Sequence, residues 1–228
     1  MCAFLCERRW LILGWFHAVA HPFHVSFFGA SRTAWRAAGC VEVVTNVLFI
    51  GYVWPEPRSS GAGTRTLELI DLFLREGWCV TFCTPAAATE RQVDLAALGV
   101  AQKTVELNNP SFDVYIRELS PDIVVFDRFM MEEQFGWRVE EQCPRALRIL
   151  DTIDLHSLRA ARQQALKTAL AGQDSEDAPN RVFTMSGSDL FECMAAHDLT
   201  QREVAAIYRS DLTLMISDVE CELLTSAF

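Results

Sequence analysis

Three residues that can transfer protons or bind hydroxyl groups, Asp151, Asp154 and His156, lie close together in the sequence. They follow an apolar run at residues 146–150, which predicts a buried strand, and they precede a long stretch with helical periodicity. A histidine in the first turn of a helix is favoured in its neutral form, which can accept a proton or bind a hydroxyl. We therefore take His156 and Asp154 as candidate catalytic residues and Asp151 as a candidate substrate-binding residue. An alternative for Asp154 is that it only caps the helix that follows.

A second candidate site is the glycine pair Gly61 and Gly63, which opens the helix predicted for residues 64–76. The loop before it, residues 53–63, is longer than an ordinary β–α loop of about 2–6 residues. Free N–H groups at a helix N-terminus favour an anion or a sugar hydroxyl, so both glycines and the neighbouring Arg65 are candidate substrate-binding residues. The alternative is that the glycines only permit a tight entry into the helix.

This loop departs from the dinucleotide-binding fingerprint. The fingerprint needs its first glycine directly after the strand, whereas Gly61 comes about eight residues later and Thr66 replaces the third glycine. The second strand ends in Thr84, where a ribose-binding acid is expected, and no Gly-Lys-Ser/Thr sequence of a P-loop follows. We therefore expect neither NAD nor FAD, and no other cofactor.

Apolar runs that alternate with helical stretches indicate the fold class. Strands are expected at residues 46–52, 78–84, 103–107, 122–126, 146–150 and 211–216. Helices are expected at residues 64–76, 90–98, 111–119, 131–142, 155–171 and 189–208, the last with a bend near His197. The acidic stretch 172–180 is expected to form a loop. This alternation predicts an α/β fold with a doubly wound parallel sheet. Ligands bind at the carboxyl ends of the strands in such sheets, so Asp127, Arg128 and Ser217, which follow strands, are further substrate-binding candidates.

The composition limits the kinds of partner and site. A formal net charge of −10 over 228 residues argues against a nucleic-acid partner, because phosphate binding needs a basic face. The eight cysteines are scattered, with no Cys-x-x-Cys pair and no clustered histidine. We therefore expect no disulfide framework and no metal site, and we interpret the cysteines as reduced thiols of a cytoplasmic protein.

Residues 1–40 differ from the rest of the chain, with three tryptophans and a single acidic residue. The apolar stretch 11–20 is shorter than the roughly 20 residues that span a bilayer, and it lacks a signal-peptide cleavage pattern. We expect residues 1–40 to be an extension and the folded domain to occupy residues 41–228. A weak association of the extension with a membrane surface is the alternative.

Three segments in register carry a resemblance to a known family: residues 47–73, 121–159 and 203–224. Over residues 46–224 the chain resembles the N-terminal half of a bacterial GT-B glycosyltransferase of the family 4 type. The resemblance implies a Rossmann-like domain that binds the acceptor and faces a second such domain, which binds a nucleotide-sugar across a cleft. It also implies that Gly61 and Gly63 approach the donor phosphates and the acceptor, and that Asp154 and His156 line the acceptor side.

Ser217 and Glu220 match a Ser-x-x-Glu pattern that, in the family, leads toward the crossing between the two domains, so both are substrate-binding candidates by resemblance. The chain ends where the family's donor-binding domain would begin, and the groups that hold the donor diphosphate belong to that domain. The resemblance thus implies the acceptor-binding domain of an enzyme that transfers a sugar from a nucleotide-sugar to a carbohydrate or other hydroxyl acceptor, and that is inactive as this fragment.

Two alternatives share the same expected fold. One is a non-catalytic interaction module that keeps a GT-B-like domain, and the other is a nucleotide-sugar epimerase of the GT-B type. The fold class alone does not separate these functions.

Overall fold

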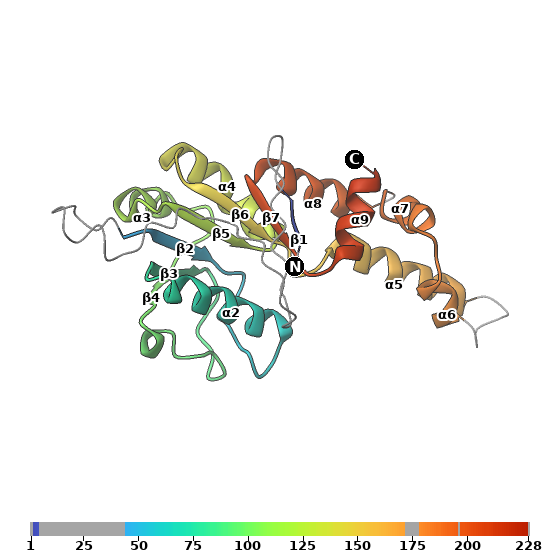
Figure 1. Ribbon diagram of the computed structural model, residues 1–228, viewed down its shortest axis with the longest axis horizontal. Helices are drawn as coiled ribbons and strands as arrows, with labels where there is room; N and C mark the ends of the chain where they lie inside the picture. The colour runs from blue at the N-terminus through green and yellow to red at the C-terminus, as the bar shows by residue number, and fades with distance from the viewer. Residues whose placement is uncertain (1, 5–43, 172–177, 196, 228) are drawn as a thin grey trace, which may run out of the picture.

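The computed structural model describes residues 2–4, 44–171, 178–195 and 197–227. Its described strands form one sheet in the order β1-β7-β6-β5-β2-β3-β4, with helices on both faces (Figure 1). The strands are β1 (Cys2–Phe4), β2 (Asn46–Ile50), β3 (Cys79–Thr84), β4 (Ala101–Thr104), β5 (Ile123–Asp127), β6 (Leu147–Asp151) and β7 (Leu212–Met215). Strands β2 to β7 pair in parallel, whereas β1 runs antiparallel to β7. The predicted α/β fold with a doubly wound parallel sheet is therefore confirmed.

The helices connect successive strands and then extend beyond the sheet. They are α2 (Gly61–Arg75), α3 (Ser111–Leu119), α4 (Phe129–Gln142), α5 (His156–Leu170), α6 (Ala178–Phe183), α7 (Gly187–Ala195), α8 (Asp198–Arg209) and α9 (Asp218–Ala227), with a short 3₁₀ helix η2 (Ala96–Leu98). The helix expected over residues 189–208 is divided into α7 and α8, at the place where a bend was expected.

The order of the six parallel strands reverses beside β2. Counted along the chain, these strands lie in the order third, second, first, fourth, fifth, sixth, which is the Rossmann arrangement. The connections leave β2 and its neighbour β5 in opposite directions across the sheet. Loops at their carboxyl ends therefore diverge, and ligands of such folds bind at this switch point.

Strand β2 shows why the apolar runs lack polar alternation. Val47 and Phe49 point into a core on one face of the sheet, whereas Leu48 and Ile50 point into a core on the other face. Helix α2 covers the first core, and helices α3 and α4 cover the second. Because all four side chains are at most 2% exposed, both faces contribute to the hydrophobic free energy of folding.

A third apolar cluster lies beyond the carboxyl ends of β6 and β7. Helices α5, α7 and α9 supply Leu158, Met194 and Leu224 to it, and β7 supplies Met215. Figure 1 shows these helices grouped at one end of the molecule, continuing from the sheet rather than lying on a face of it. The first turn of α5 is thereby held between the sheet and this helical group.

The prediction of a helix at residues 90–98 is wrong, because the one helical segment there is a 3₁₀ turn at Ala96–Leu98. The backbone N–H of Val93 donates to the carbonyl of Pro55 in the β2–α2 loop, at 3.0 Å, and so leaves the helical pattern. The Leu95 side chain, fully buried, anchors the segment to the sheet. Tertiary contacts with the long loop replace helical hydrogen bonds here.

The expected loop at residues 172–180 also needs correction, and part of the N-terminal extension is described. Residues 178–180, expected in a loop, begin α6, while 172–177 lie outside the described residues. Residues 1–40 were expected to be an extension that precedes the folded domain, and within them Cys2–Phe4 pairs with β7 as the antiparallel edge strand. The apolar stretch 11–20 lies outside the described residues. Within the part of the chain that is described, no helix is long and apolar enough to cross a membrane.

Candidate functional site

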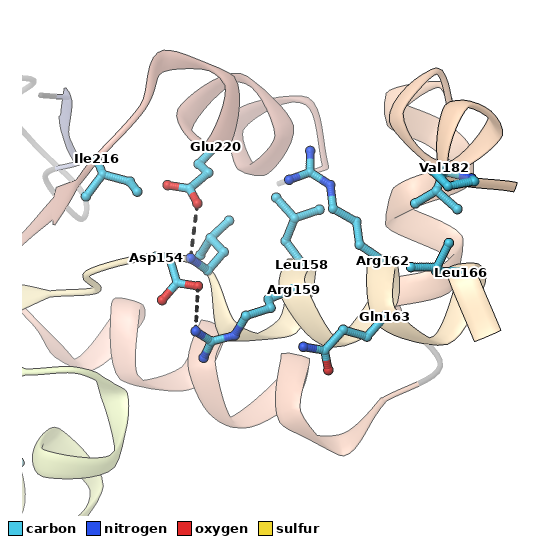
Figure 2. A pocket seen from close by; sticks show the side chains of 11 residues that line it. Asp154, Leu158, Arg159, Arg162, Gln163, Leu166, Val182, Ile216 and Glu220 are labelled. Atoms are coloured by element: carbon cyan, nitrogen blue, oxygen red, sulfur yellow. Dashed lines mark hydrogen bonds and ion pairs between the residues drawn. The ribbon is translucent and has the colours of Figure 1, made fainter. Parts of the chain in front are cut away.

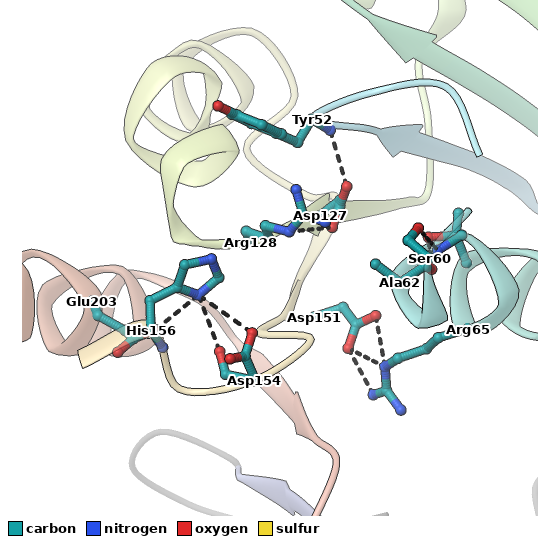
Figure 3. Close-up of polar contacts among 12 residues, drawn as sticks. Tyr52, Ser60, Ala62, Arg65, Asp127, Arg128, Asp151, Asp154, His156 and Glu203 are labelled. Carbon is teal, nitrogen blue, oxygen red and sulfur yellow. Dashed lines mark hydrogen bonds and ion pairs between the residues drawn. The ribbon is translucent and has the colours of Figure 1, made fainter. Parts of the chain in front are cut away.

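Most of the predicted site residues meet where β2, β5 and β6 end, a region that we call the carboxyl edge (Figure 3). Asp127 ends β5 and Asp151 ends β6, and the two residues are neighbours in the parallel register. The start of α2 lies on one side of these aspartates, and the start of α5 lies on the other. The carboxyl edge therefore gathers residues that are far apart in the sequence.

Helix α2 begins at Gly61, and its first turn has one side-chain cap. The Ser60 hydroxyl accepts a hydrogen bond from the N–H of Gly63 at 3.1 Å. A Cβ atom at Gly63 would lie 2.6 Å from the backbone of Glu56, so this glycine is required by the loop folding back on the helix. A Cβ at Gly61 would meet nothing within 4 Å. Close packing therefore explains why residue 63 is a glycine, whereas no contact in the described residues requires a glycine at position 61.

Arg65 and Asp151, both predicted as substrate-binding residues, bind each other. The Arg65 Nε donates to both carboxylate oxygens of Asp151, at 2.8 and 3.0 Å, and Nη2 lies 2.6 Å from Oδ1. Burial raises the pKa of Asp151, although the Arg65 guanidinium opposes the shift. The ion pair fixes α2 against the end of β6. Both side chains therefore have a structural role here.

Asp127 is a buried carboxylate with one oxygen that accepts no hydrogen bond from the described residues. Its Oδ2 accepts the N–H of Tyr52 at 3.0 Å, which ties β5 to the loop after β2. Its Oδ1 has no hydrogen-bond donor among the described residues and lies 3.6 Å from the Nε of Arg128. Burial raises the pKa of Asp127, which is only 7% exposed. An unsatisfied buried oxygen at a strand end is a position where a ligand group can bind.

Arg128 has a backbone conformation that side chains rarely adopt, with φ 72° and ψ 157°. Its N–H donates to the carbonyl of Asp151 at 2.8 Å, and its guanidinium lies 5.1 Å from the centre of the Tyr52 ring. Holding a non-glycine residue in this backbone conformation lowers the stability of the fold by about 1–3 kcal/mol, and such strained residues concentrate at functional sites. Ile153, in the turn after β6, also has a positive φ of 64°.

His156 is the first residue of α5, as expected for a histidine in the first turn. Its Nδ1 lies 3.1 Å from the carbonyl oxygen of Asp154, 3.6 Å from Oε1 of Glu203 and 3.8 Å from Oδ1 of Asp154. The ring packs edge-on against Phe129, with centres 5.6 Å apart. In Figure 3 the opposite edge of the imidazole is turned away from these oxygens, toward Arg128.

Asp154 does not cap α5, because the N-cap residue is Leu155 and has no side-chain hydrogen bond to the helix. The Asp154 carboxylate instead pairs with Arg159, with Oδ2 3.1 Å from Nη1. The alternative that Asp154 is only a helix cap is therefore wrong. Its backbone carbonyl positions the ring of His156, while its carboxylate lies beside the ring.

Two distant glutamates supply the caps of α5, and Glu203 was missed by the sequence analysis. Glu203 accepts the N–H groups of His156 and Ser157, at 2.9 and 3.0 Å, and the Ser157 hydroxyl at 2.5 Å. Glu220 accepts the N–H of Leu155 at 3.2 Å. Glu203 lies on the buried side of the amphipathic helix α8, and a charged residue at such a position indicates a buried partner. The sequence does not identify that partner, because His156 and Ser157 lie far away along the chain.

Ser217 and Glu220 lie at the start of α9, and the Glu220 side chain reaches the start of α5. The Ser217 hydroxyl accepts the N–H of Glu220 at 3.2 Å, which caps the start of α9. Burial raises the pKa of Glu220, whose side chain faces α5. Ser217 therefore caps its own helix, whereas Glu220 joins α9 to the residue that precedes His156.

In the described part of the chain, no group of three or more His, Cys, Asp and Glu side chains is arranged to hold a metal ion.

The comparisons with known proteins give little information. No protein-family model matches the chain, and no curated protein matches it. A solved structure, a proposed Zn-dependent alcohol dehydrogenase from Rhodobacter sphaeroides, is 15% identical, with 80% of this chain and 72% of that chain covered and a TM-score of 0.33. The fold class rests on the order and direction of the strands themselves.

Proposed function

We propose that residues 41–228 form the acceptor-side domain of a glycosyltransferase. The acceptor hydroxyl binds at the carboxyl edge, beside His156, and a sugar is transferred to it from a nucleotide-sugar. The proposal is supported by the Rossmann arrangement of the sheet, by the gathering of Asp127, Arg128 and His156 at one edge, and by the family resemblance of the sequence. The buried thiol of Cys83 fits a reducing compartment, and we place the protein in the cytoplasm.

The contact between Nδ1 of His156 and the carbonyl oxygen of Asp154 is the observation that carries the proposal. A carbonyl oxygen can only accept a hydrogen bond, so the Nδ1 of His156, 3.1 Å from the Asp154 carbonyl, carries the proton in the tautomer that makes this bond. In the neutral ring the opposite nitrogen, Nε2, then has a free lone pair. A nitrogen in this state can accept a proton from a hydroxyl group, which is the task of a general base.

The carboxylates around Nδ1 suit the same role. Glu203 Oε1 and Asp154 Oδ1 lie within 4 Å of Nδ1 and attract the positive charge that the ring gains when Nε2 accepts a proton. In the proposed reaction the acceptor oxygen bonds to the anomeric carbon, its proton passes to Nε2, and the nucleoside diphosphate departs with the electrons of the broken bond. His156 is the catalytic residue of this step, and Asp154 and Glu203 are positioning residues.

The leaving diphosphate needs more positive charge than this domain offers. At the carboxyl edge, the N–H groups at the start of α2 and the guanidinium of Arg128 could bind the diphosphate. Arg65 is not free to do so, because it is bound to Asp151. A charge-assisted hydrogen bond contributes only about 1.5–3 kcal/mol. The proposal therefore requires a donor-binding domain that faces the carboxyl edge.

The test is a transfer assay on the protein as its gene encodes it. Nucleoside diphosphate release is measured with a panel of nucleotide-sugars and a panel of hydroxyl acceptors, for the wild type and for His156→Gln. The matched control is His197→Gln, because His197 precedes α8 and makes no side-chain capping bond. We expect kcat/KM to fall by about 10²–10⁴-fold in His156→Gln and to be unchanged in the control.

Other outcomes of this assay contradict the proposal in different ways. Wild-type turnover by His156→Gln would show that the histidine is not the base. Interconversion of nucleotide-sugars without an acceptor would indicate an epimerase, and a lack of turnover with every donor would indicate a non-catalytic interaction module.

A further inference from the structure

A pocket of about 390 Å³ lies in the helical group, on the side of the start of α5 where Asp154 and Glu220 lie (Figure 2). Its lining comes from the turn between β6 and α5, which includes Asp154, from α5 and α6, and from Ile216 and Glu220 at and after the end of β7. The lining residues include Leu155, Leu158, Leu166, Val182 and Ile216. Because these side chains are apolar, most of the wall favours an apolar molecule over water.

Glu220 brings an unsatisfied buried oxygen to this pocket. Its Oε1 accepts the N–H of Leu155, whereas its Oε2 has no hydrogen-bond donor among the described residues. Glu220 is only 7% exposed, so water has little access to the carboxylate. A buried acceptor without a partner costs about 1–3 kcal/mol and is unusual in folded proteins.

Arg162 brings an unsatisfied donor to the same pocket. Its Nε is buried and has no acceptor within the part of the chain that the structure describes. In Figure 2 the side chain rises from α5 between Leu158 and Leu166, while Glu220 enters the pocket from α9. The neighbouring Arg159, in contrast, is neutralised by Asp154.

We propose that this pocket binds a small uncharged amphiphile, an alcohol with an aliphatic or aromatic body. Its hydroxyl donates to Oε2 of Glu220 or accepts from Nε of Arg162, and its body packs on the leucines of α5. A hydroxyl is the smallest group that can both donate and accept a hydrogen bond. The volume lies in the range of about 300–1,000 Å³ typical of ligand pockets. The inference does not require the proposed glycosyl transfer, although Asp154 both lines this pocket and contacts His156.

The opposite charges of Glu220 and Arg162 argue against a charged ligand head. A carboxylate would gain from Arg162 and would be repelled by Glu220, and an ammonium group would meet the reverse. An alcohol carries no net charge and avoids both penalties. Specificity for the uncharged head thus follows from the two unsatisfied groups together.

The experiment compares hexanol, hexanoate and hexylammonium, which share one body and differ in the head. Saturation-transfer NMR and titration of backbone amide resonances measure their binding to the full chain, since a ligand of this size binds weakly. Ile216→Trp fills the mouth of the pocket, where Ile216 is 46% exposed. The matched control is Leu170→Trp, at the 50% exposed end of α5, outside the pocket lining. Arg162→Met removes the unsatisfied donor.

We expect hexanol to bind more tightly than either charged probe and to shift amide resonances around Leu158 and Val182. Ile216→Trp should weaken hexanol binding by about tenfold or more, Arg162→Met by about tenfold, and Leu170→Trp by less than about twofold. Amide spectra of each variant check that the fold is kept. Equal hexanol affinity in Ile216→Trp and the wild type would overturn the pocket as the binding site. Absence of hexanol binding would overturn the proposal, and tighter binding of a charged probe would overturn the assigned head.

Discussion

Helices α2 and α5 start at the same edge of the sheet, yet different groups bind the N–H groups at their N-termini (Figure 3). The start of α2 has a local cap, the Ser60 hydroxyl, and within the described residues no buried carboxylate binds its glycine-rich first turn. The start of α5 has no local cap and binds two buried carboxylates, those of Glu203 and Glu220. One helix end is left accessible, and the other is closed by the protein.

This difference shows two uses of the positive end of a helix. An open end can receive the negative charge of a ligand, as expected for α2. A closed end instead serves as an anchor, and in α5 the anchored residue is His156, whose N–H is held by Glu203. The closed helix therefore fixes the catalytic candidate, while the open helix remains available to substrate.

Removing the carboxylate that closes α5 should have the largest effect on stability. Glu203→Ala leaves the buried N–H groups of His156 and Ser157 and the Ser157 hydroxyl without their acceptor. We expect the free energy of unfolding, measured by urea denaturation, to fall by about 3 kcal/mol. Glu203→Gln, which keeps one acceptor oxygen, should lose less, and the exposed Glu192→Ala should change little. A Glu203→Ala loss below 1 kcal/mol would remove the distinction between the two helix ends.

The two glycines at the start of α2 should respond in opposite ways to alanine. Gly63→Ala places a Cβ 2.6 Å from the backbone of Glu56, and we expect it to lower the free energy of unfolding by about 2 kcal/mol. Gly61→Ala meets nothing and should be neutral or stabilising by up to about 1 kcal/mol. Thermal unfolding of both variants, followed by circular dichroism, measures the contrast. Equal losses would mean that the loop does not fold back as described.

A smaller loss is expected at the local cap of α2. Ser60→Ala removes the oxygen that accepts the N–H of Gly63, and we expect a loss of about 1 kcal/mol. Only one N–H loses its acceptor here, whereas Glu203→Ala removes the acceptor of two N–H groups and a hydroxyl. Ser60→Asp is the matched control and should retain the wild-type free energy of unfolding, since aspartate also caps. If Ser60→Ala destabilises as much as Glu203→Ala, the α2 end is not open to solvent.

The smallest expected effect is the pH dependence from Glu220. Burial and the carboxylates of Asp154 and Glu203 raise the pKa of Glu220, whereas the N–H of Leu155 lowers it. The folded state therefore binds this proton more tightly than the unfolded state, and stability falls as the pH rises through the raised pKa. This loss of stability is absent at pH values below 4.5, the ordinary pKa of a glutamate side chain. Glu220→Gln, which keeps an acceptor for Leu155, should gain stability relative to the wild type as the pH rises above that value. A constant difference across pH would show that Glu220 is not shifted.

Local signals in the sequence were sufficient for the fold and for part of the site. The apolar runs predicted as strands at residues 46–52 and 122–126 contain most of β2 and β5, and the positions after these runs identify Asp127 and Arg128. The helix predicted at residues 64–76 is α2, which begins earlier, at Gly61. These features depend on neighbours within a few positions, so periodicity and turn chemistry predict them.

Partners from distant segments could not be predicted in this way. Arg65 binds Asp151, 86 positions away, which turns two substrate-binding candidates into a structural ion pair. Glu203 binds the N–H of His156, 47 positions away, and gives no local capping pattern. The positive φ of Arg128 also follows from the surrounding strands, because nothing in an arginine favours it.

The proton on the ring of His156 can be located directly. In a chain labelled with ¹⁵N-histidine, long-range ¹H–¹⁵N correlations distinguish a protonated nitrogen from one with a free lone pair, and His156→Gln assigns the signals. We predict that Nδ1 is protonated, because it donates to the carbonyl of Asp154, and that Nε2 is the free acceptor. The opposite tautomer, with the proton on Nε2, would contradict the assignment of His156 as the base at the carboxyl edge.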